Sequence, residues 1–232
     1  MSFSYGWRGP NIVKDGLALY LDPGSPNSYY NKTGTTIKDI SGNGLNGSLT
    51  NFGSQTIYNS ANGGSIVFDG IDDFINLTNI GFSLMGSGIS STVSLWTKVT
   101  NLSPGRNMVF FEQSTNSSNR YVIWFQDSDD TLNFYPNALN HKSSTININT
   151  WYFICTTVNG TSSKMYLNGN QIGSSVNYSP SNTNTNTYLG VSPIYTNEFL
   201  YGGISNLQIY NRELTAQEVL QNYNSTRSRF GL

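Results

Sequence analysis

Three aspartates surround one glycine in the first half of the chain: Asp69, Asp72 and Asp73 flank Gly70. Hard cations such as Ca²⁺ bind carboxylate, amide and carbonyl oxygens supplied by loops, so calcium is the one cofactor that this cluster could hold. The same carboxylates could instead accept hydrogen bonds from the backbone of a turn. We favour the turn, and expect alanine at Asp69 or Asp73 to lower stability.

A second acidic cluster, Asp127, Asp129 and Asp130, lies between two runs of strand-forming residues. It could also bind calcium, but a solvated hairpin tip explains it as well. We favour the hairpin tip.

The four glutamates do not form a catalytic pattern. Glycoside hydrolysis needs two carboxylates that flank the scissile bond. None of the glutamates alternates with another acid along a strand, and two of them belong to the start of a helix; they are Glu112, Glu198, Glu213 and Glu218. We therefore expect no enzymatic activity.

His141 is the only histidine and Cys155 the only cysteine. A nucleophile activated by histidine would have to use His141, which lies in a polar segment that predicts a solvent-facing loop. Cys155 lies in the apolar stretch 151–158, which predicts a buried thiol. Zinc sites built from nitrogen and sulfur ligands are excluded by these counts.

Four aromatic residues could stack on sugar rings. Glycan sites combine exposed rings with nearby amide and hydroxyl groups, and the candidates by residue type are Trp96, Trp124, Tyr135 and Tyr195. For each tryptophan, burial between the sheets is the alternative. We favour it because a large ring contributes most to stability when it is buried.

The two ends of the chain lie outside the strand pattern. An N-terminal arm, residues 1–15, carries Phe3, Tyr5, Trp7 and Arg8, and a C-terminal tail, residues 227–232, carries Phe230. Aromatic and arginine side chains dominate interface energies, so both ends could anchor the protein to a partner. The arm could equally pair with its own sheet, and the tail could cover the sandwich.

Composition excludes several classes of partner. Charged residues make up 11% of the chain and the formal net charge is −1, with no basic run. Nucleic acid and anionic membranes are therefore unexpected partners. No stretch approaches 18 apolar residues, so we expect no membrane insertion. The first ten residues lack the features of a signal peptide, and we expect synthesis in a cytoplasm without export.

Alternating and β-branched segments predict an all-β domain over residues 16–226. In 92–99, Val93 and Leu95 fall on one face and Trp96 on the other. The pair Asn168 and Gly169 predicts a tight hairpin turn. The expected strands are 17–22, 65–69, 74–77, 92–99, 108–112, 121–127, 131–135, 152–158, 164–167, 171–174, 187–190 and 204–210.

One helix is predicted, beginning near Thr215. Thr215 and Glu218 have the spacing of a capping box, and Leu214 and Val219 that of a hydrophobic staple. The helix should pack against the sandwich.

Several segments now resemble the laminin-G-like, concanavalin A-like jelly-roll family. They are DISGNGLNG at 39–47, SIVFDGIDDFI at 65–75, MYLNG at 165–169 and GISNLQIYNRELT at 203–215. The resemblance implies two antiparallel sheets in a jelly-roll sandwich. Relatives often carry an acidic calcium ligand in the last long strand, where this chain has Asn206, so Asn206 would have to replace it.

The ends of this region are similar to structural proteins of tailed bacteriophages, in IVKDGLALYLD at 12–22, EVLQNYN at 218–224 and RFGL at 229–232. This likeness implies a virion protein that contacts other virion proteins, as capsid decoration or another outer-surface component. The alternative is an adhesion module, on a tail or fibre, that binds host surface polysaccharide. Glycan hydrolysis is the least favoured function. Fold alone does not choose among them.

Overall fold

The computed structural model describes residues 11–53, 57–77, 80–86, 88–102, 105–135, 141–160, 162–177 and 186–232. The predicted anchors Phe3, Tyr5, Trp7 and Arg8 lie outside the described residues, so their role stays a prediction.

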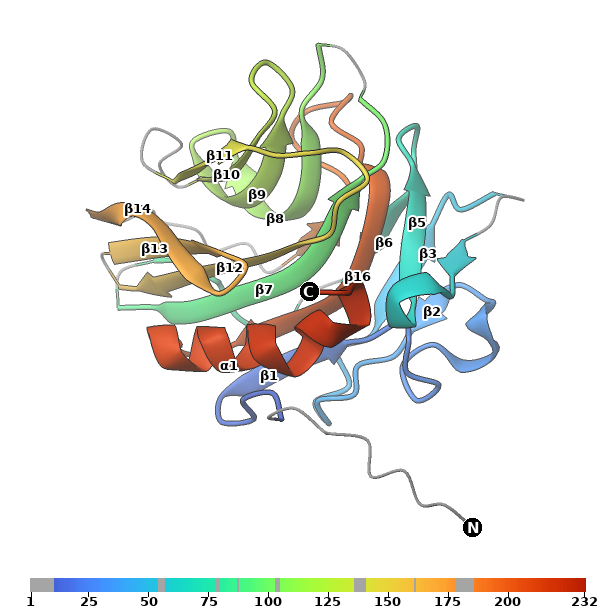
Figure 1. Cartoon of the computed structure of the whole chain (residues 1–232), viewed down its shortest axis with the longest axis horizontal. Coiled ribbons are helices and arrows are strands. Elements are labelled where there is room, and N and C mark those ends of the chain that lie inside the picture. The colour runs from blue at the N-terminus through green and yellow to red at the C-terminus, as the bar shows by residue number, and fades with distance from the viewer. Residues whose placement is uncertain are drawn as a thin grey trace.

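Two antiparallel sheets lie face to face (Figure 1). The first has the order β14 (Asn170–Asn177), β13 (Ser162–Leu167), β12 (Tyr152–Asn159), β7 (Ser90–Val99), β16 (Tyr201–Tyr210), β5 (Ser65–Asp69) and β4 (Tyr58–Asn59), and β1 (Leu17–Leu21) also pairs with β16. The second has the order β11 (Lys142–Thr145), β10 (Thr131–Tyr135), β9 (Asn119–Gln126), β8 (Met108–Asn116), β15 (Thr187–Leu189), β6 (Phe74–Asn76), β3 (Gly47–Thr50) and β2 (Thr36–Ile37). The predicted all-β sandwich is confirmed.

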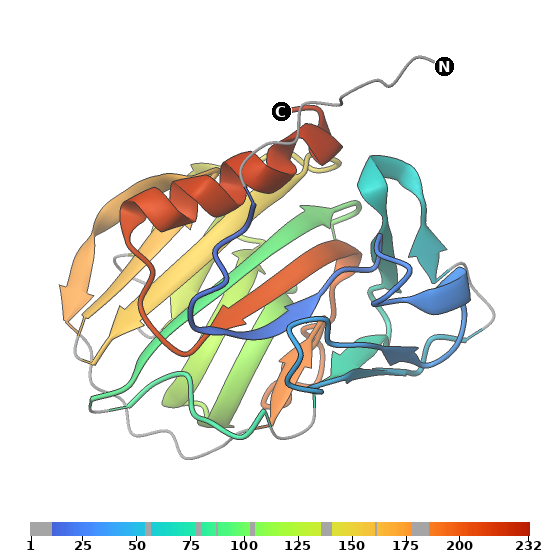
Figure 2. The ribbon, with the colours of Figure 1, turned by 90° about the horizontal axis from the view of Figure 1, so that it is seen from below.

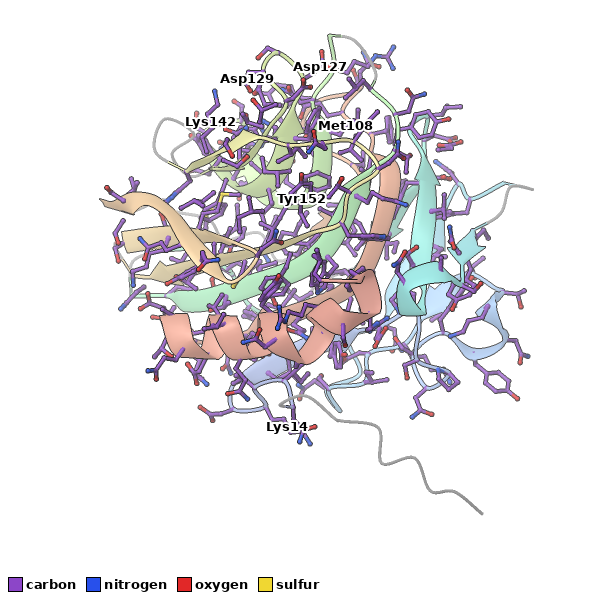
Figure 3. All side chains as sticks on the ribbon, in the orientation of Figure 1. Lys14, Met108, Asp127, Asp129, Lys142 and Tyr152 are labelled. Atoms are coloured by element: carbon purple, nitrogen blue, oxygen red, sulfur yellow. The ribbon has the colours of Figure 1, made fainter. Side chains whose placement is uncertain are left out.

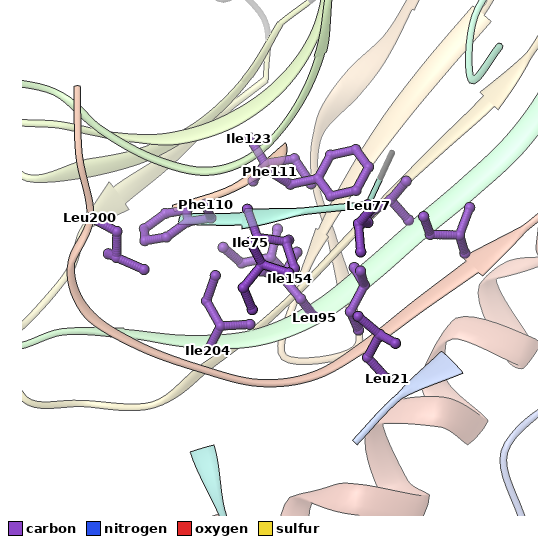
Figure 4. Packing of buried hydrophobic residues seen from close by; sticks show 14 of the residues in the cluster. Leu21, Ile75, Leu77, Leu95, Phe110, Phe111, Ile123, Ile154, Leu200 and Ile204 are labelled. Atoms are coloured by element: carbon purple, nitrogen blue, oxygen red, sulfur yellow. The ribbon is translucent and has the colours of Figure 1, made fainter. Parts of the chain in front are cut away.

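The main core fills the space between the sheets (Figure 4). Leu95 and Ile154 face it from the first sheet, and Phe111 and Ile123 from the second, all without exposed surface. Successive side chains along a strand point to opposite faces of the sheet, so every second residue faces this core and the residues between them point outward. The outward residues of each sheet therefore form a second face, which is either covered by other segments of the chain or exposed to solvent.

Helix α1 (Ala216–Thr226) covers part of the outer face of the first sheet (Figure 2). Its predicted capping box is confirmed, because Thr215 and Glu218 each accept a hydrogen bond from the other's backbone. Trp96 and Phe153 lie beneath it, and the Trp96 ring stacks on Phe230 with 3.9 Å between centroids. Strand β7 is therefore buried on both faces, where its alternation predicted burial on one.

The C-terminal residues belong to this second core. Arg227–Phe230 form a short 3₁₀ helix, η3, and Phe230 is only 8% exposed. The Arg229 guanidinium pairs with both carboxylate oxygens of Asp22, at 2.9 and 3.0 Å. The expectation that Phe230 contacts a partner is therefore wrong, because its ring is buried against Trp96 inside the domain. Two further 3₁₀ turns, η1 (Tyr30–Lys32) and η2 (Ala61–Gly63), lie in connections.

His141 is buried, contrary to the prediction of a solvent-facing residue. Its side chain has no exposed surface, and its Nε2 lies 2.9 Å from the Ser163 hydroxyl on β13. The residue precedes β11 in the second sheet, so this contact joins the two sheets near one edge. Burial lowers the His141 pKa from 6.5 to about 4, which keeps the imidazole neutral.

Across the described part of the chain, no helix has the length and apolar character needed to cross a membrane.

Candidate glycan-binding site

A continuous row of outward residues crosses the second sheet. Paired residues on neighbouring strands connect Ser48 to Asn76, Asn76 to Tyr188, Tyr188 to Glu112, Glu112 to Val122 and Val122 to Tyr135. Paired residues on neighbouring strands share a face of the sheet, so all six point away from the core. Trp124 lies on the same face, two residues from Val122 and opposite Asn133.

The segment between β15 and β16, residues 191–199, lies against this face, and we call it the strap. Val191 and Phe199 pair as an isolated antiparallel bridge that closes it at its base. The Ser192 hydroxyl accepts hydrogen bonds from the backbone N–H groups of Ile194 and Tyr195. These local contacts give the strap a fixed shape, so its side chains can form one wall of a site.

Arg120 joins the strap to the sheet. Its Nε and Nη2 donate to the two carboxylate oxygens of Glu112, each at 2.7 Å. Nη2 also donates to the Ser192 hydroxyl at 3.3 Å and lies 3.7 Å from Glu198. The guanidinium lies 4.8 Å from the Tyr195 ring centroid, within cation–π range. A bidentate pair beneath and three strap contacts above fix the orientation of this side chain.

A pocket of about 230 Å³ opens beside Arg120, lined by Asn107, Arg120, Trp124, Tyr195 and Glu198. It adjoins a second hollow of about 290 Å³ that shares Asn107, Tyr195 and Glu198 and adds Arg106. Tyr195 is 42% exposed and Trp124 is half-buried. Two aromatic rings therefore face an open groove that also offers amide, guanidinium and carboxylate groups.

Charges in the pocket are nearly balanced. Glu112 is fully buried and its carboxylate is bound on both oxygens by Arg120. Burial raises the pKa of Glu198, while the Asn107 amide and Arg120 act in the opposite direction. The Asn107 Nδ2 donates to Glu198 at 3.3 Å. The pocket therefore presents mostly hydrogen-bonding groups of fixed position and little net charge.

Three of the four predicted sugar-stacking residues share this face. Trp124 and Tyr195 line the pocket, and Tyr135 lies on the neighbouring strand beside Val122. Trp96 does not, because its ring is fully buried under α1 and its Nε1 donates to Thr226 at 2.9 Å. The prediction that Trp96 binds a glycan is wrong, and the favoured alternative of burial holds for it.

Sequence reasoning missed Arg120, Asn107 and the role of Glu198. One available signal was the pair of opposite charges at Glu112, which ends the predicted strand 108–112, and Arg120, which directly precedes the predicted strand 121–127, since opposite charges pair between neighbouring strands. The contribution of the strap had no such signal, because nothing local indicates where a connection folds.

The first acidic cluster lies at the turn between β5 and β6, with carboxylate oxygens of all three aspartates within 4.8 Å of one another. Asp69 Oδ1 accepts from the N–H groups of Ile71 and Asp72, and Asp73 Oδ2 accepts from the N–H of Asp69 at 2.9 Å. The predicted turn role is therefore present. A calcium ion held by the same carboxylates stays a prediction.

Asn206 does not belong to this cluster. Tyr201 pairs with Asp69, and Asn206 follows five residues later on β16, roughly 16 Å along the strand. Asn206 is also buried, at 1% exposure. Its prediction as a metal ligand is wrong, because the strand runs away from the turn.

The second acidic cluster lies at the β9–β10 hairpin (Figure 3). Asp127 Oδ2 accepts from the N–H of Gly105 at 2.6 Å, and Asp129 pairs with Lys142. Asp130 has a φ of 54°, a left-handed value that aspartate tolerates in turns. These contacts fit the predicted hairpin tip.

Comparison with known proteins identifies the family. The model of the concanavalin A-like lectin/glucanases superfamily matches residues 69–220, about two thirds of the chain. No sequence among the curated proteins matches.

Solved structures share the fold at low sequence identity. Trypanosoma rangeli sialidase in complex with sialic acid is 12% identical with a TM-score of 0.69, over 95% of this chain and 35% of that one. The binding domain of botulinum neurotoxin serotype D is 17% identical with a TM-score of 0.63, over 92% and 52%. Domain 4 of AbnA, a GH43 extracellular arabinanase from Geobacillus stearothermophilus in complex with arabinotriose, is 22% identical with a TM-score of 0.61, over 89% and 98%.

This chain spans about a third of the length of the sialidases that it matches, and at such identities the likeness concerns the fold alone. Together with the two-sheet sandwich and the family match, it places the protein in the concanavalin A-like lectin/glucanase superfamily.

Proposed function

We propose that this domain is a non-catalytic carbohydrate-binding module whose site is the pocket beside Arg120. The observation that carries the proposal is the meeting of Trp124 from β9 and Tyr195 from the strap around one groove. Aromatic rings stack on the apolar faces of sugars, and amide and charged groups at fixed positions bond their hydroxyls. Asn107, Arg120 and Glu198 supply those bonds.

The balance of charge favours a neutral sugar. The Arg120 charge is already compensated by Glu112, and an acidic sugar would place a second anion beside Glu198. A neutral oligosaccharide needs no such compensation, because hydroxyl groups both donate and accept.

The two glutamates near Arg120 are not arranged for glycoside hydrolysis. The Glu112 and Glu198 carboxylates both approach Arg120, but Glu112 has no exposed surface and both its oxygens are bonded. A general acid or nucleophile must reach the scissile bond. Glu112 would have to break two charge-assisted hydrogen bonds to do so, and among the described residues Glu198 is the one acidic side chain that lines the pocket.

Glycan binding is tested by calorimetric titration of the full chain with neutral and acidic oligosaccharides. Arabinotriose, which domain 4 of the arabinanase binds, is a suitable first neutral probe. Trp124→Ala and Tyr195→Ala should each weaken binding about fivefold or more, since ring stacking contributes about 1 kcal/mol or more. Tyr30→Ala, at an aromatic residue 70% exposed outside the second sheet, is the control and should bind normally. Equal affinity in all four proteins would refute the site.

We also propose that the module acts on a bacteriophage particle, bound to other virion proteins and exposed on its outer surface. The likeness of residues 12–22, 218–224 and 229–232 to phage structural proteins supports this, and the arm with Tyr5 and Trp7 is the proposed anchor. Deleting residues 2–10 should leave a folded domain that no longer joins the particle, as scored by immunogold electron microscopy. Full occupancy by the truncated protein would contradict the anchor, and absence of the intact protein from particles would contradict the location.

A further inference from the structure

We propose that a second sugar-binding subsite lies on the other side of the strap, at Phe74 on β6 and Tyr188 on β15, and that one extended neutral oligosaccharide engages both subsites. This inference rests on the proposed function, and names the length of ligand that the face recognises.

Both rings point outward from the second sheet. Their chain neighbours Ile75 and Leu189 are buried in the main core, at 2% and 1% exposure, so the alternation of the strands turns Phe74 and Tyr188 the other way. The two rings contact each other at 6.2 Å between centroids with 57° between planes. Both remain half-buried, so each keeps part of its ring open to solvent.

The residues around the two rings suit a neutral sugar. Asn76 pairs with Tyr188 across the strands, and Thr50 pairs with Phe74. Ser48 lies opposite Asn76 and is exposed. The outward residues here are thus two aromatic rings, one amide and two hydroxyls, with no charged side chain among them. Solvated faces of antiparallel sheets usually carry polar residues. Two adjacent aromatic rings on this face are therefore candidates for stacking against a ligand.

The second subsite and the pocket lie on the same face of the second sheet, on either side of the strap. Tyr188 pairs directly with Glu112, which lies beneath Arg120 and pairs with Val122 on the strand of Trp124. Tyr188 and Trp124 are therefore two strands and two residues apart, roughly 12 Å between their backbones. Arg120 covers Glu112 between them, and neither Glu112 nor Val122 has exposed surface. One oligosaccharide of several units can therefore reach both.

Two linked subsites should make affinity depend on chain length. Once one end is bound, the other faces its subsite at high effective concentration. We therefore expect a long neutral oligosaccharide to bind at least about tenfold more tightly than a trisaccharide of the same sugar.

The experiment titrates wild-type protein, Tyr188→Ala, Tyr188→Phe and Trp124→Ala with a trisaccharide and a longer oligomer of the same neutral series. Tyr188→Ala should leave trisaccharide affinity unchanged and remove the tenfold gain of the longer oligomer. Tyr188→Phe keeps the ring and should keep the gain, and Trp124→Ala should weaken both ligands. Circular dichroism melting curves for each variant show whether the fold is retained.

The outcomes separate the two proposals. If the trisaccharide binds but Tyr188→Ala leaves the length dependence intact, the second subsite is refuted and the pocket stands. If the Tyr188→Phe variant loses the gain, ring stacking is refuted as its cause. If no neutral oligosaccharide of either length binds the wild-type protein, the proposed function itself fails.

Discussion

Replacing Glu112 with glutamine should destabilise the domain and loosen the strap. Glutamine has nearly the same shape, but it offers Arg120 one neutral acceptor in place of two charged ones at 2.7 Å. Arg120 is 12% exposed and, within the part of the chain that the structure describes, keeps only Glu198, at 3.7 Å, as a compensating charge. Removing one partner of a buried pair costs about 3–5 kcal/mol, and the hydrogen bond that glutamine retains reduces the expected loss to about 2 kcal/mol.

Thermal unfolding measures this loss. For a domain of this size, about 2 kcal/mol corresponds to a fall in Tm of about 4–8 °C. Arg120→Met and the double variant Glu112→Gln with Arg120→Met complete a double-mutant cycle. The double variant should be no less stable than Arg120→Met alone, which gives a coupling energy of about 2 kcal/mol.

Hydrogen exchange tests the link to the strap. Since Arg120 contacts Ser192, Tyr195 and Glu198, amides of residues 192–198 should exchange faster in Glu112→Gln than in the wild type. A stability loss below about 0.5 kcal/mol, or unchanged exchange in the strap, would refute the reasoning that this pair holds the wall of the pocket.

Three further predictions follow from the buried residues. Folding lowers the His141 pKa from 6.5 to about 4, so between these pH values the unfolded chain binds a proton that the folded chain does not. The free energy of unfolding should therefore be at its full value above pH 6.5 and fall by up to about 3 kcal/mol as the pH drops to 4. Melting curves of His141→Gln as a function of pH should lack that part of the slope, and an unchanged slope would exclude His141 as its source. Asp73→Ala removes the acceptor for the Asp69 N–H and should lower the free energy of unfolding by about 1–3 kcal/mol, with oligosaccharide affinity unchanged. Loss of affinity at constant Tm, or a wild-type Tm that a chelator shifts by several degrees, would favour calcium binding over the turn role. Phe230→Ala opens a cavity against Trp96 and should cost about 3–5 kcal/mol in urea unfolding, and a change below about 1 kcal/mol would show that the C-terminal residues do not belong to the core.

The sequence by itself determined the features that depend on neighbours a few residues away. The capping box at Thr215 and Glu218 formed as predicted, because both partners lie within one helical turn. Asn168 and Gly169 adopt the positive φ values, 50° and 82°, that the hairpin turn requires. Period-two alternation assigned the long strands for the same reason. Of the strands of two to four residues, β6 and β15 were predicted, but β2, β3, β4 and β11 were missed. So short a segment carries little pattern of its own, and pairing with a neighbouring strand creates it.

Only the tertiary structure decided which faces are covered and which side chains meet. Alternation placed Trp96 on the face opposite Leu95, but a helix more than a hundred residues later in the sequence determines that this face is buried. Trp124 and Tyr195 are likewise distant in sequence, and they share a pocket because the strap folds back onto β9. Burial and site geometry are sums over contacts between distant segments, so no local pattern of residue types encodes them.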